Sequence, residues 1–247
     1  MEKMIVLQVI AHLLADFTFQ PEKWCKSKLE SGFQSKYLYI HTVIVFTCSW
    51  FFSFSLQFVW LALLVAVIHF VCDGLKSITE RIIIKKNNSG SNSLLTFVFI
   101  VDQLIHLIVI ILVSCLYTRV YGGLWFAPEI SLQLLLIIMG YILCLKPANV
   151  IIQSVLHSYS LLPINNQQED SDLEKAGRLI GNLERILAFT LALLSQYGAI
   201  GFIIAAKSIL RYKQGDVKKT EYVLIGTLLS FSIAILLEIL ITKVLLI

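Results

Sequence analysis

Long apolar runs fill most of this chain, and they restrict it to folds in which helices cross a lipid bilayer. A membrane-crossing helix needs about 20 predominantly apolar residues. Here 57% of the residues are hydrophobic, only 15% are charged, and the mean hydropathy is +0.82. The apolar runs fall near residues 3–20, 37–55, 57–79, 94–117, 130–155, 186–209 and 221–246. We therefore predict an all-α fold, a polytopic transmembrane helix bundle with about seven spans.

The chain is expected to have two transmembrane halves and no separate soluble domain. Residues 1–120 would form a four-helix half, and residues 121–247 a C-terminal half with a polar loop at 157–175. The first and third loops are rich in lysine and arginine, which places them in the cytoplasm and the N-terminus outside. Seven spans that alternate in direction would place the basic loop before the last run outside, whereas its charge predicts that it is cytoplasmic. We therefore expect a re-entrant segment or a bend, at Lys146-Pro147 or at Ser195-Gln196-Tyr197-Gly198.

Composition also limits the partners of the chain. The net charge of +4 is carried by a few loops, so it sets membrane orientation and does not indicate a nucleic-acid-binding surface. The five cysteines contain no Cys-x-x-Cys pair and lie mostly in apolar runs, as small buried side chains do. The expected partners are the lipid bilayer and a lipid-like or membrane-associated substrate, and an oligomer is left open.

Ionisable side chains interrupt four of the apolar runs at helical spacing. An ionised group near the bilayer centre costs about 2.5–3.5 kcal/mol on insertion scales. Residues four apart lie on one helix face, so each group forms a polar stripe. The stripes are His12, Asp16 and Gln20; His41; His69, Asp73 and Lys76; and Asp102 and His106. So many costly groups need a compensating partner, and a metal ion is the most economical one.

The positions of these residues within their runs predict that they meet. His12 and Asp16 lie near the end of the first run, and His41 lies near the start of the second. Asp73 lies near the end of the third run and Asp102 near the start of the fourth. Because consecutive spans are antiparallel, all these positions fall on one side of the membrane, which the loop charges make cytoplasmic. We expect one shared cavity that opens to the cytoplasm.

Imidazole and carboxylate groups from different helices are typical ligands of zinc, iron and manganese. We predict one or two divalent ions, zinc first and manganese or iron next. The candidate ligands are His12, Asp16, His41, His69, Asp73, Asp102 and His106. Asp16, Lys76 and Gln20 are the candidate catalytic groups, and the last two would hold a substrate anion or orient a water. A proton relay and interhelical hydrogen bonding, worth about 0.6 kcal/mol per bond, are the alternatives.

At these residues the chain resembles a bacterial family of multi-pass membrane proteins, domain of unknown function 3307. The matching pieces of the first half are His12-Leu-Leu-Ala-Asp16-Phe with Gln20, His41, His69-Phe-Val-Cys-Asp73-Gly-Leu-Lys76 and Asp102-Gln103-Leu-Ile-His106. Those of the second half are Gly177-Arg-Leu-Ile-Gly181-Asn-Leu-Glu184-Arg185, Ala199-Ile-Gly201-Phe, Ala206-Lys207-Ser208-Ile and Glu221-Tyr222-Val-Leu-Ile-Gly226-Thr227-Leu-Leu-Ser230. The resemblance implies a bacterial membrane protein and supplies no activity. On the His-x-x-x-Asp pattern alone, the chain is also similar to inner-membrane proteins predicted to be metal-dependent hydrolases.

The polar stripes and the resemblance together favour a metal-dependent hydrolase embedded in the bacterial cytoplasmic membrane. Its metal would lie near the cytoplasmic face and act on a lipid-like or membrane-associated substrate. Two alternatives stay open. An ion- or proton-coupled transporter would need a polar path to the outer face, whereas a non-catalytic membrane scaffold would keep its function after the stripes were made apolar.

Overall fold

The computed structural model describes residues 1–86, 92–122, 130–158, 171–212 and 217–244. These residues form helices and short turns and contain no strand, so the all-α prediction is confirmed for this part of the chain. Their contacts divide the chain into two compact units, Met1–Met139 and Gly140–Ile247. We call them the first and the second unit and describe each by itself.

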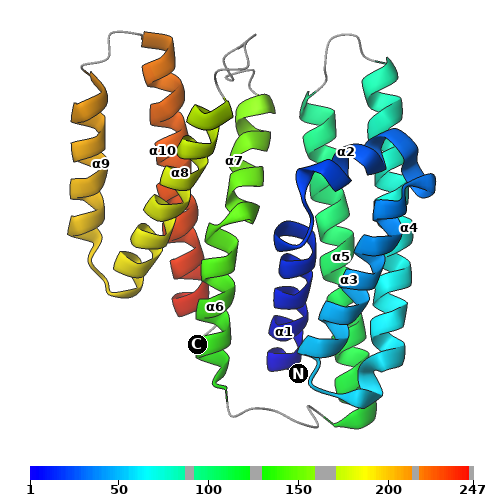
Figure 1. Cartoon of the computed structure of the whole chain (residues 1–247). Helices are drawn as coiled ribbons and strands as arrows, with labels where there is room; N and C mark the ends of the chain where they lie inside the picture. The colour runs from blue at the N-terminus through cyan, green and yellow to red at the C-terminus, as the bar shows by residue number, and fades with distance from the viewer. Residues whose placement is uncertain (87–91, 123–129, 159–170, 213–216, 245–247) are drawn as a thin grey trace. The chain divides into compact units, whose positions relative to one another are not determined.

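The first unit is a group of four packed helices with a fifth across one end. Helix α1 packs against α3 and α5, and α4 packs against the same two helices. Helix α2 packs against α3 and α4 beyond the end of α1, and α4 and α5 extend past it (Figure 1). The helices and turns are α1 (Glu2–Leu13), η1 (Leu14–Thr18), α2 (Glu22–Ser31), η2 (Gly32–Gln34), α3 (Lys36–Phe52), η3 (Leu56–Phe58), α4 (Val59–Lys86) and α5 (Asn92–Tyr121).

Small side chains let the helices of the first unit approach closely, as is usual where helices associate in lipid. Ala15, Ala62 and Ala66 are buried in its apolar core. The one large polar ring there, Tyr117, stacks edge-on against Phe58 and donates its hydroxyl proton to Ser55 Oγ at 2.7 Å. The polar stripes of the sequence therefore face a tightly packed interior.

A π-helical turn ends the first helix and sets the direction of the next. In η1 the amide of Phe19 donates to the carbonyl oxygen of Leu14 at 2.8 Å, a bond that closes over five residues. Pro21 follows immediately before α2 and brings extended backbone. The two helices meet at 83°. As a result α2 leaves the direction of α1 and crosses the end of the helix group (Figure 1).

The second unit is built around α10, which packs against α7, α8 and α9. Its elements are α6 (Leu132–Cys144, whose first residues belong to the first unit), α7 (Lys146–Ser158), α8 (Ser171–Leu193), α9 (Tyr197–Tyr212), α10 (Val217–Ile239) and the π-helical turn η5 (Leu240–Val244). The axes of α6 and α7 differ by 44°. This bend falls at the place where the sequence predicts an interruption, before Lys146-Pro147.

A buried arginine holds the bend between α6 and α7. Arg185 is only 2% exposed, and its Nε donates at 2.6 Å to the carbonyl oxygen of Cys144, the last residue of α6. The positive charge therefore lies at the negative end of a helix, where it is most favourable. The remaining guanidinium hydrogen bonds go to neutral acceptors, namely Asn149 Oδ1, Asn182 Oδ1 and Ser230 Oγ.

The prediction of about seven spans is too high for the described part of the chain. Three helices are long and apolar enough to cross a membrane, and the number is up to five if each bent pair forms one span. The three are Leu56–Lys86, Ser93–Tyr121 and Leu224–Lys243. The other runs fall short because the first is bent after η1, α3 has only 17 residues, and α9 has only 16.

The helix is also interrupted at the second expected place, Ser195-Gln196-Tyr197-Gly198. Helix α8 ends at Leu193, α9 begins at Tyr197, and Ser195 between them has a φ of +56°. Most of the predicted polar loop at 157–175 falls on residues 159–170, which lie outside the described residues.

Gly74 gives a test of the packing between α4 and the turn that follows α2. A Cβ atom at this position would lie 2.1 Å from Phe33 Cε1, which is far inside van der Waals contact. Gly74→Ala is therefore expected to lower the free energy of unfolding by about 1–3 kcal/mol, measured by denaturation in detergent. Gly201→Ala is the matched control, because a Cβ there meets no atom within 4 Å. Equal stability of the two variants would contradict the packing of Phe33 on Gly74.

A candidate metal centre in the first unit

Five of the predicted site residues converge inside the first unit. His12 comes from α1, Asp16 from the π-turn η1, His41 from α3, His69 from α4 and His106 from α5. We call these five residues the histidine–aspartate cluster. His41, His69 and His106 are buried, and the side chains of His12 and Asp16 are 11% exposed. The antiparallel order of the helices thus brings the polar stripes together, as their positions in the sequence predict.

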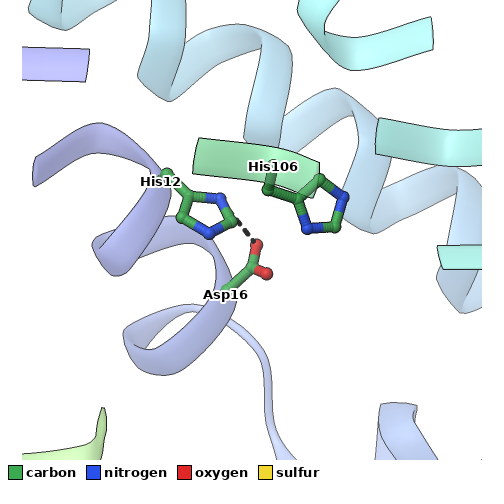
Figure 2. A group of neighbouring side chains, drawn as sticks. All are labelled: His12, Asp16 and His106. Carbon is green, nitrogen blue, oxygen red and sulfur yellow. Dashed lines mark ion pairs between the residues drawn. The ribbon is translucent and has the colours of Figure 1, made fainter. Parts of the chain in front are cut away.

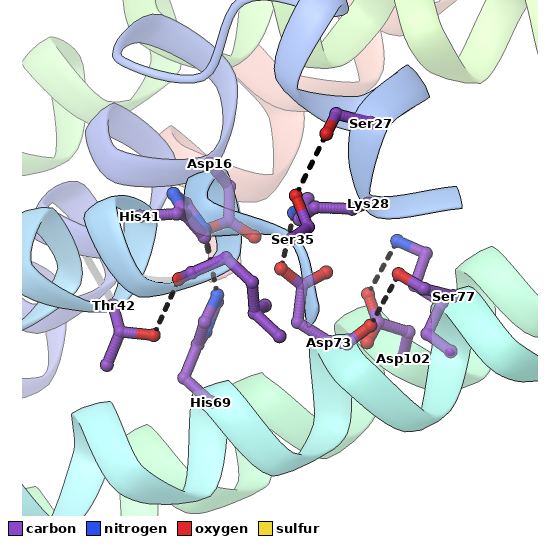
Figure 3. Close-up of polar contacts among 12 residues, drawn as sticks. Asp16, Ser27, Lys28, Ser35, His41, Thr42, His69, Asp73, Ser77 and Asp102 are labelled. Carbon is purple, nitrogen blue, oxygen red and sulfur yellow. Dashed lines mark hydrogen bonds and ion pairs between the residues drawn. The ribbon is translucent and has the colours of Figure 1, made fainter. Parts of the chain in front are cut away.

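Three atoms of the cluster form a compact triangle. Asp16 Oδ1 lies 3.4 Å from His41 Nε2 and 3.5 Å from His69 Nε2, and the two imidazole nitrogens are 3.0 Å apart (Figure 3). A triangle with these edges has a circumradius of about 1.9 Å, just below zinc–ligand distances of about 2.0–2.1 Å. Asp16, His41 and His69 would therefore be able to hold one divalent ion together.

Hydrogen bonding alone does not satisfy these groups. A bond between the two imidazoles accounts for the 3.0 Å contact. It leaves Asp16 Oδ1 and His41 Nδ1 buried with no hydrogen-bond partner. Buried polar atoms are paired in the great majority of cases, because an unpaired one costs about 1–3 kcal/mol. A cation between the carboxylate and the two rings would remove this cost at Asp16.

A second set of ligand atoms shares the same carboxylate. His12 Nδ1 lies 3.7 Å from Asp16 Oδ1, and Figure 2 shows the carboxylate between the rings of His12 and His106. The ring of His106 also stacks on that of His69, with centroids 4.1 Å apart. Asp16 Oδ1 therefore lies 3.4–3.7 Å from histidines of three different helices, and a carboxylate oxygen of Asp16 lies within 4.8 Å of a ligand atom of His106 on a fourth.

Asp73 and Asp102 lie outside the cluster, in ion pairs with lysines. Asp73 accepts a short hydrogen bond from Lys28 of α2 (Figure 3), and Asp102 accepts one from Lys76 at 2.9 Å. His106 Nδ1 and Asp102 Oδ1 are 3.8 Å apart, which is too long for a hydrogen bond. Two of the seven predicted ligands thus have cationic partners of their own.

Lys76 and Gln20, two of the predicted catalytic groups, differ in their burial and in their neighbours. The Lys76 amine is held by Asp102 and lies 5.1 Å from the centre of the Phe99 ring. Its side chain is 19% exposed. Gln20 is buried in the segment between η1 and α2, four residues beyond Asp16.

Three residues of the site were not predicted from the sequence. Gln8 is one turn before His12 and forms two hydrogen bonds with Ser49, at 2.9 and 2.6 Å. Gln8 continues the four-residue spacing of the first stripe, so the sequence pattern does indicate this residue. Gln103 binds His12 Nε2 at 3.3 Å, and Lys28 reaches Asp73 from α2. Gln103 lies on a different helix from His12, and Lys28 lies on a different helix from Asp73, so spacing along one helix does not connect them.

A small cavity adjoins the cluster on the side away from α2. It has room for about one water molecule. Its lining joins three cluster histidines to the Gln8–Ser49 pair and to apolar side chains of α3, α4 and α5; the residues are Gln8, His12, Val45, Ser49, Val65, His69, His106, Val109 and Ile110. The cluster is therefore in contact with space that a small polar molecule can occupy.

The fold and the cluster define a helical, membrane-type protein with histidine and aspartate side chains gathered between its helices. The chain belongs to the family described as Protein of unknown function (DUF3307), whose model matches residues 4–140. The match covers more than half of the chain and nearly coincides with the first unit, so the whole cluster lies in the family's part. No curated protein and no solved structure matches the chain.

Proposed function

We propose that this protein is a metal-dependent hydrolase embedded in the bacterial cytoplasmic membrane, acting on a lipid-like or membrane-associated substrate. The observation that carries the proposal is the triangle of Asp16 Oδ1, His41 Nε2 and His69 Nε2, whose edges of 3.0–3.5 Å suit one divalent ion. Two imidazoles and one carboxylate are also the ligand set of several catalytic zinc sites, in which the fourth position is left for water or substrate.

The chemistry of such a site follows from its ligands. A bound divalent ion would lower the pKa of a water toward about 7 and polarise a carbonyl or phosphoryl oxygen. Two nitrogens and one oxygen are the ligand set of some catalytic zinc sites and of non-haem iron(II) sites, and manganese would also accept it. Asp16 would serve as a ligand, and Lys76 and Gln20 would hold the substrate or orient the water.

The surroundings of the cluster favour a substrate that approaches through lipid. The helices that carry His69 and His106 expose large apolar side chains beside them, among them Val71, Leu75 and Leu104. Exposed apolar faces of this kind on membrane-crossing helices lie against acyl chains. By the charges of the loops, the end of the helix group covered by α2 would be the cytoplasmic one.

Metal analysis of the purified protein tests the proposal directly. We expect at least one divalent transition ion per chain in detergent, measured by elemental mass spectrometry. Dialysis against a chelator should abolish hydrolysis of phospholipids or lipid phosphates in mixed micelles, and zinc or manganese should restore it. A protein that purifies without stoichiometric metal, and binds none when zinc is added back, would overturn the proposal.

One observation favours ion transport as a second candidate function. Beyond the cluster, on the side away from α2, the interior contains the Gln8–Ser49 pair and the buried hydroxyl of Ser114, which has no hydrogen-bond partner. These groups extend the polar interior past the depth of the histidines. Flux of protons or divalent ions into liposomes, lost in Asp16→Asn, would favour transport over hydrolysis.

A further inference from the structure

We infer that the histidine–aspartate cluster binds two metal ions bridged by Asp16. One ion would be held by His41 and His69, and the other by His12 and His106. This inference rests on the proposed metal site and adds its nuclearity, its bridging ligand and the charge of its substrate.

The spacing of the ligand atoms separates the histidines into two pairs. Atoms of Asp16, His41 and His69 all lie within 4.8 Å of one another, and so do atoms of Asp16, His12 and His106. No group of this kind among the described residues contains both pairs. A single zinc ion holds ligand atoms at most about 4.2 Å apart, twice the zinc–nitrogen distance. One ion therefore serves one pair, and the carboxylate is the ligand that both pairs share.

A hydrogen-bond chain fixes the tautomer of His12 in favour of a ligand. Asp102 can only accept, and its Oδ2 receives bonds from Lys76 at 2.9 Å and from Gln103 Nε2 at 3.1 Å. The amide oxygen of Gln103 is therefore the atom that faces His12 Nε2, at 3.3 Å. It accepts the Nε2 proton and leaves Nδ1 with a lone pair.

The unprotonated nitrogen of His12 lies near another electron-rich atom. Nδ1 lies 3.7 Å from the carboxylate oxygen Asp16 Oδ1. Two acceptor atoms this close together repel each other unless a cation lies between them or beside them. Metal-bound histidines usually donate a hydrogen bond from their second ring nitrogen, and this bond orients the ring. The bond from His12 Nε2 to Gln103 is of this kind.

His106 provides the independent observation. It is 4% exposed, and neither of its ring nitrogens has a hydrogen-bond partner. Its ring is held by stacking on His69 and lies 5.3 Å from the ring of His12. A fully buried imidazole with two unsatisfied nitrogens is costly. Coordination of an ion shared with Asp16 and His12 would satisfy one of them.

A two-ion centre also defines the charge of the substrate. Two divalent ions carry four positive charges, and the cluster opposes them with the single negative charge of Asp16. Lys28 and Lys76 already neutralise Asp73 and Asp102, so these carboxylates add little. Two-metal sites with ions about 3.5–4 Å apart are typical of phosphoryl-group hydrolysis. The geometry therefore points to an anionic, phosphorylated substrate at the membrane.

Metal counting and manganese resonance test the inference together. The full-length protein in detergent should bind two zinc ions per chain by elemental analysis. When loaded with Mn²⁺ alone, it should give the exchange-coupled electron paramagnetic resonance spectrum of an ion pair. His106→Ala should bind one ion and give an uncoupled spectrum. The wild-type spectrum keeps the test decisive even if this variant does not fold.

The outcomes separate the inference from the proposed function. One ion per chain with an uncoupled spectrum would overturn the two-ion centre and leave a mononuclear hydrolase in place. Two coupled ions in a protein that hydrolyses no lipid phosphate or phospholipid would support the centre and remove the proposed function. A His106→Ala variant that folds and still binds two ions would also overturn the inference.

Discussion

Asp16→Asn is expected to weaken zinc binding at least about 100-fold, because loss even of a residue that only orients a ligand costs about 10–100-fold. Asparagine keeps the shape of the side chain and removes the charge that three histidines face at 3.4–3.7 Å. Since both ligand sets contain Asp16, the variant should lose all bound metal. Zinc titration of the chelator-treated protein, followed by elemental analysis, measures the effect.

The matched control for this change is Glu30→Gln. Glu30 is exposed on α2, carries the same charge and lies in neither ligand set. It should retain the wild-type metal content. If Asp16→Asn binds zinc as tightly as Glu30→Gln does, the carboxylate is not a ligand, and the proposed centre fails.

Lys28→Met is expected to lower the free energy of unfolding of the first unit by about 3–5 kcal/mol, the usual cost of breaking a buried ion pair from one side. Lys28 is 4% exposed and Asp73 is 7% exposed, so the carboxylate left behind would have little access to water. The variant would also loosen α2, although the bond from Arg81 Nε to the Leu29 carbonyl oxygen at 3.0 Å and the stacking of Trp24 on Tyr37 would remain. Denaturation in detergent and limited proteolysis measure the two effects.

Two further variants show whether the ion pair is responsible. Lys28→Met combined with Asp73→Asn removes both charges and should recover most of the lost stability. Lys26→Met changes an exposed lysine of the same helix and should leave stability within about 0.5 kcal/mol of the wild type. A double variant as unstable as Lys28→Met alone would show that Lys28 acts through packing.

The parts of the site that follow from one dominant physical rule could be predicted from the sequence. The cost of ionisable groups in lipid singled out the stripes, and four-residue spacing placed His12 with Asp16 and Asp102 with His106 on common helix faces. The antiparallel order of the helices then brought His41 and His69 to the same level as Asp16. These rules depend only on helix geometry, so they hold without knowledge of the packing.

Other features depended on contacts that no local pattern contains. Lys28 belongs to a lysine-rich segment that the positive-inside rule assigns to orientation, and its reach into the interior follows from the 83° turn before α2. Asp73 shares a stripe with His69, yet its carboxylate binds that lysine. The division of the histidines into two pairs depends on ring orientations, which spacing along a helix does not determine.

The number of spans was overestimated because hydropathy does not report helix breaks. The first apolar run continues past Leu14–Thr18 to about residue 20, but there the helix widens and ends. The run near 130–155 is likewise apolar across a 44° bend. In both cases the interruption is a property of the backbone and its partners, such as Arg185 at the end of α6.

The π-helical turn at Leu14–Thr18 makes the cluster sensitive to the length of the chain. A π-turn closes over one residue more than an α-turn, so the segment contains one residue beyond what a continuous α-helix would use. Loss of a residue between His12 and Asp16 would regularise the helix and rotate the carboxylate by about 100° around the helix axis, away from its present position among the histidines. Relatives that have this centre are therefore expected to exchange apolar residues here freely and to avoid insertions and deletions.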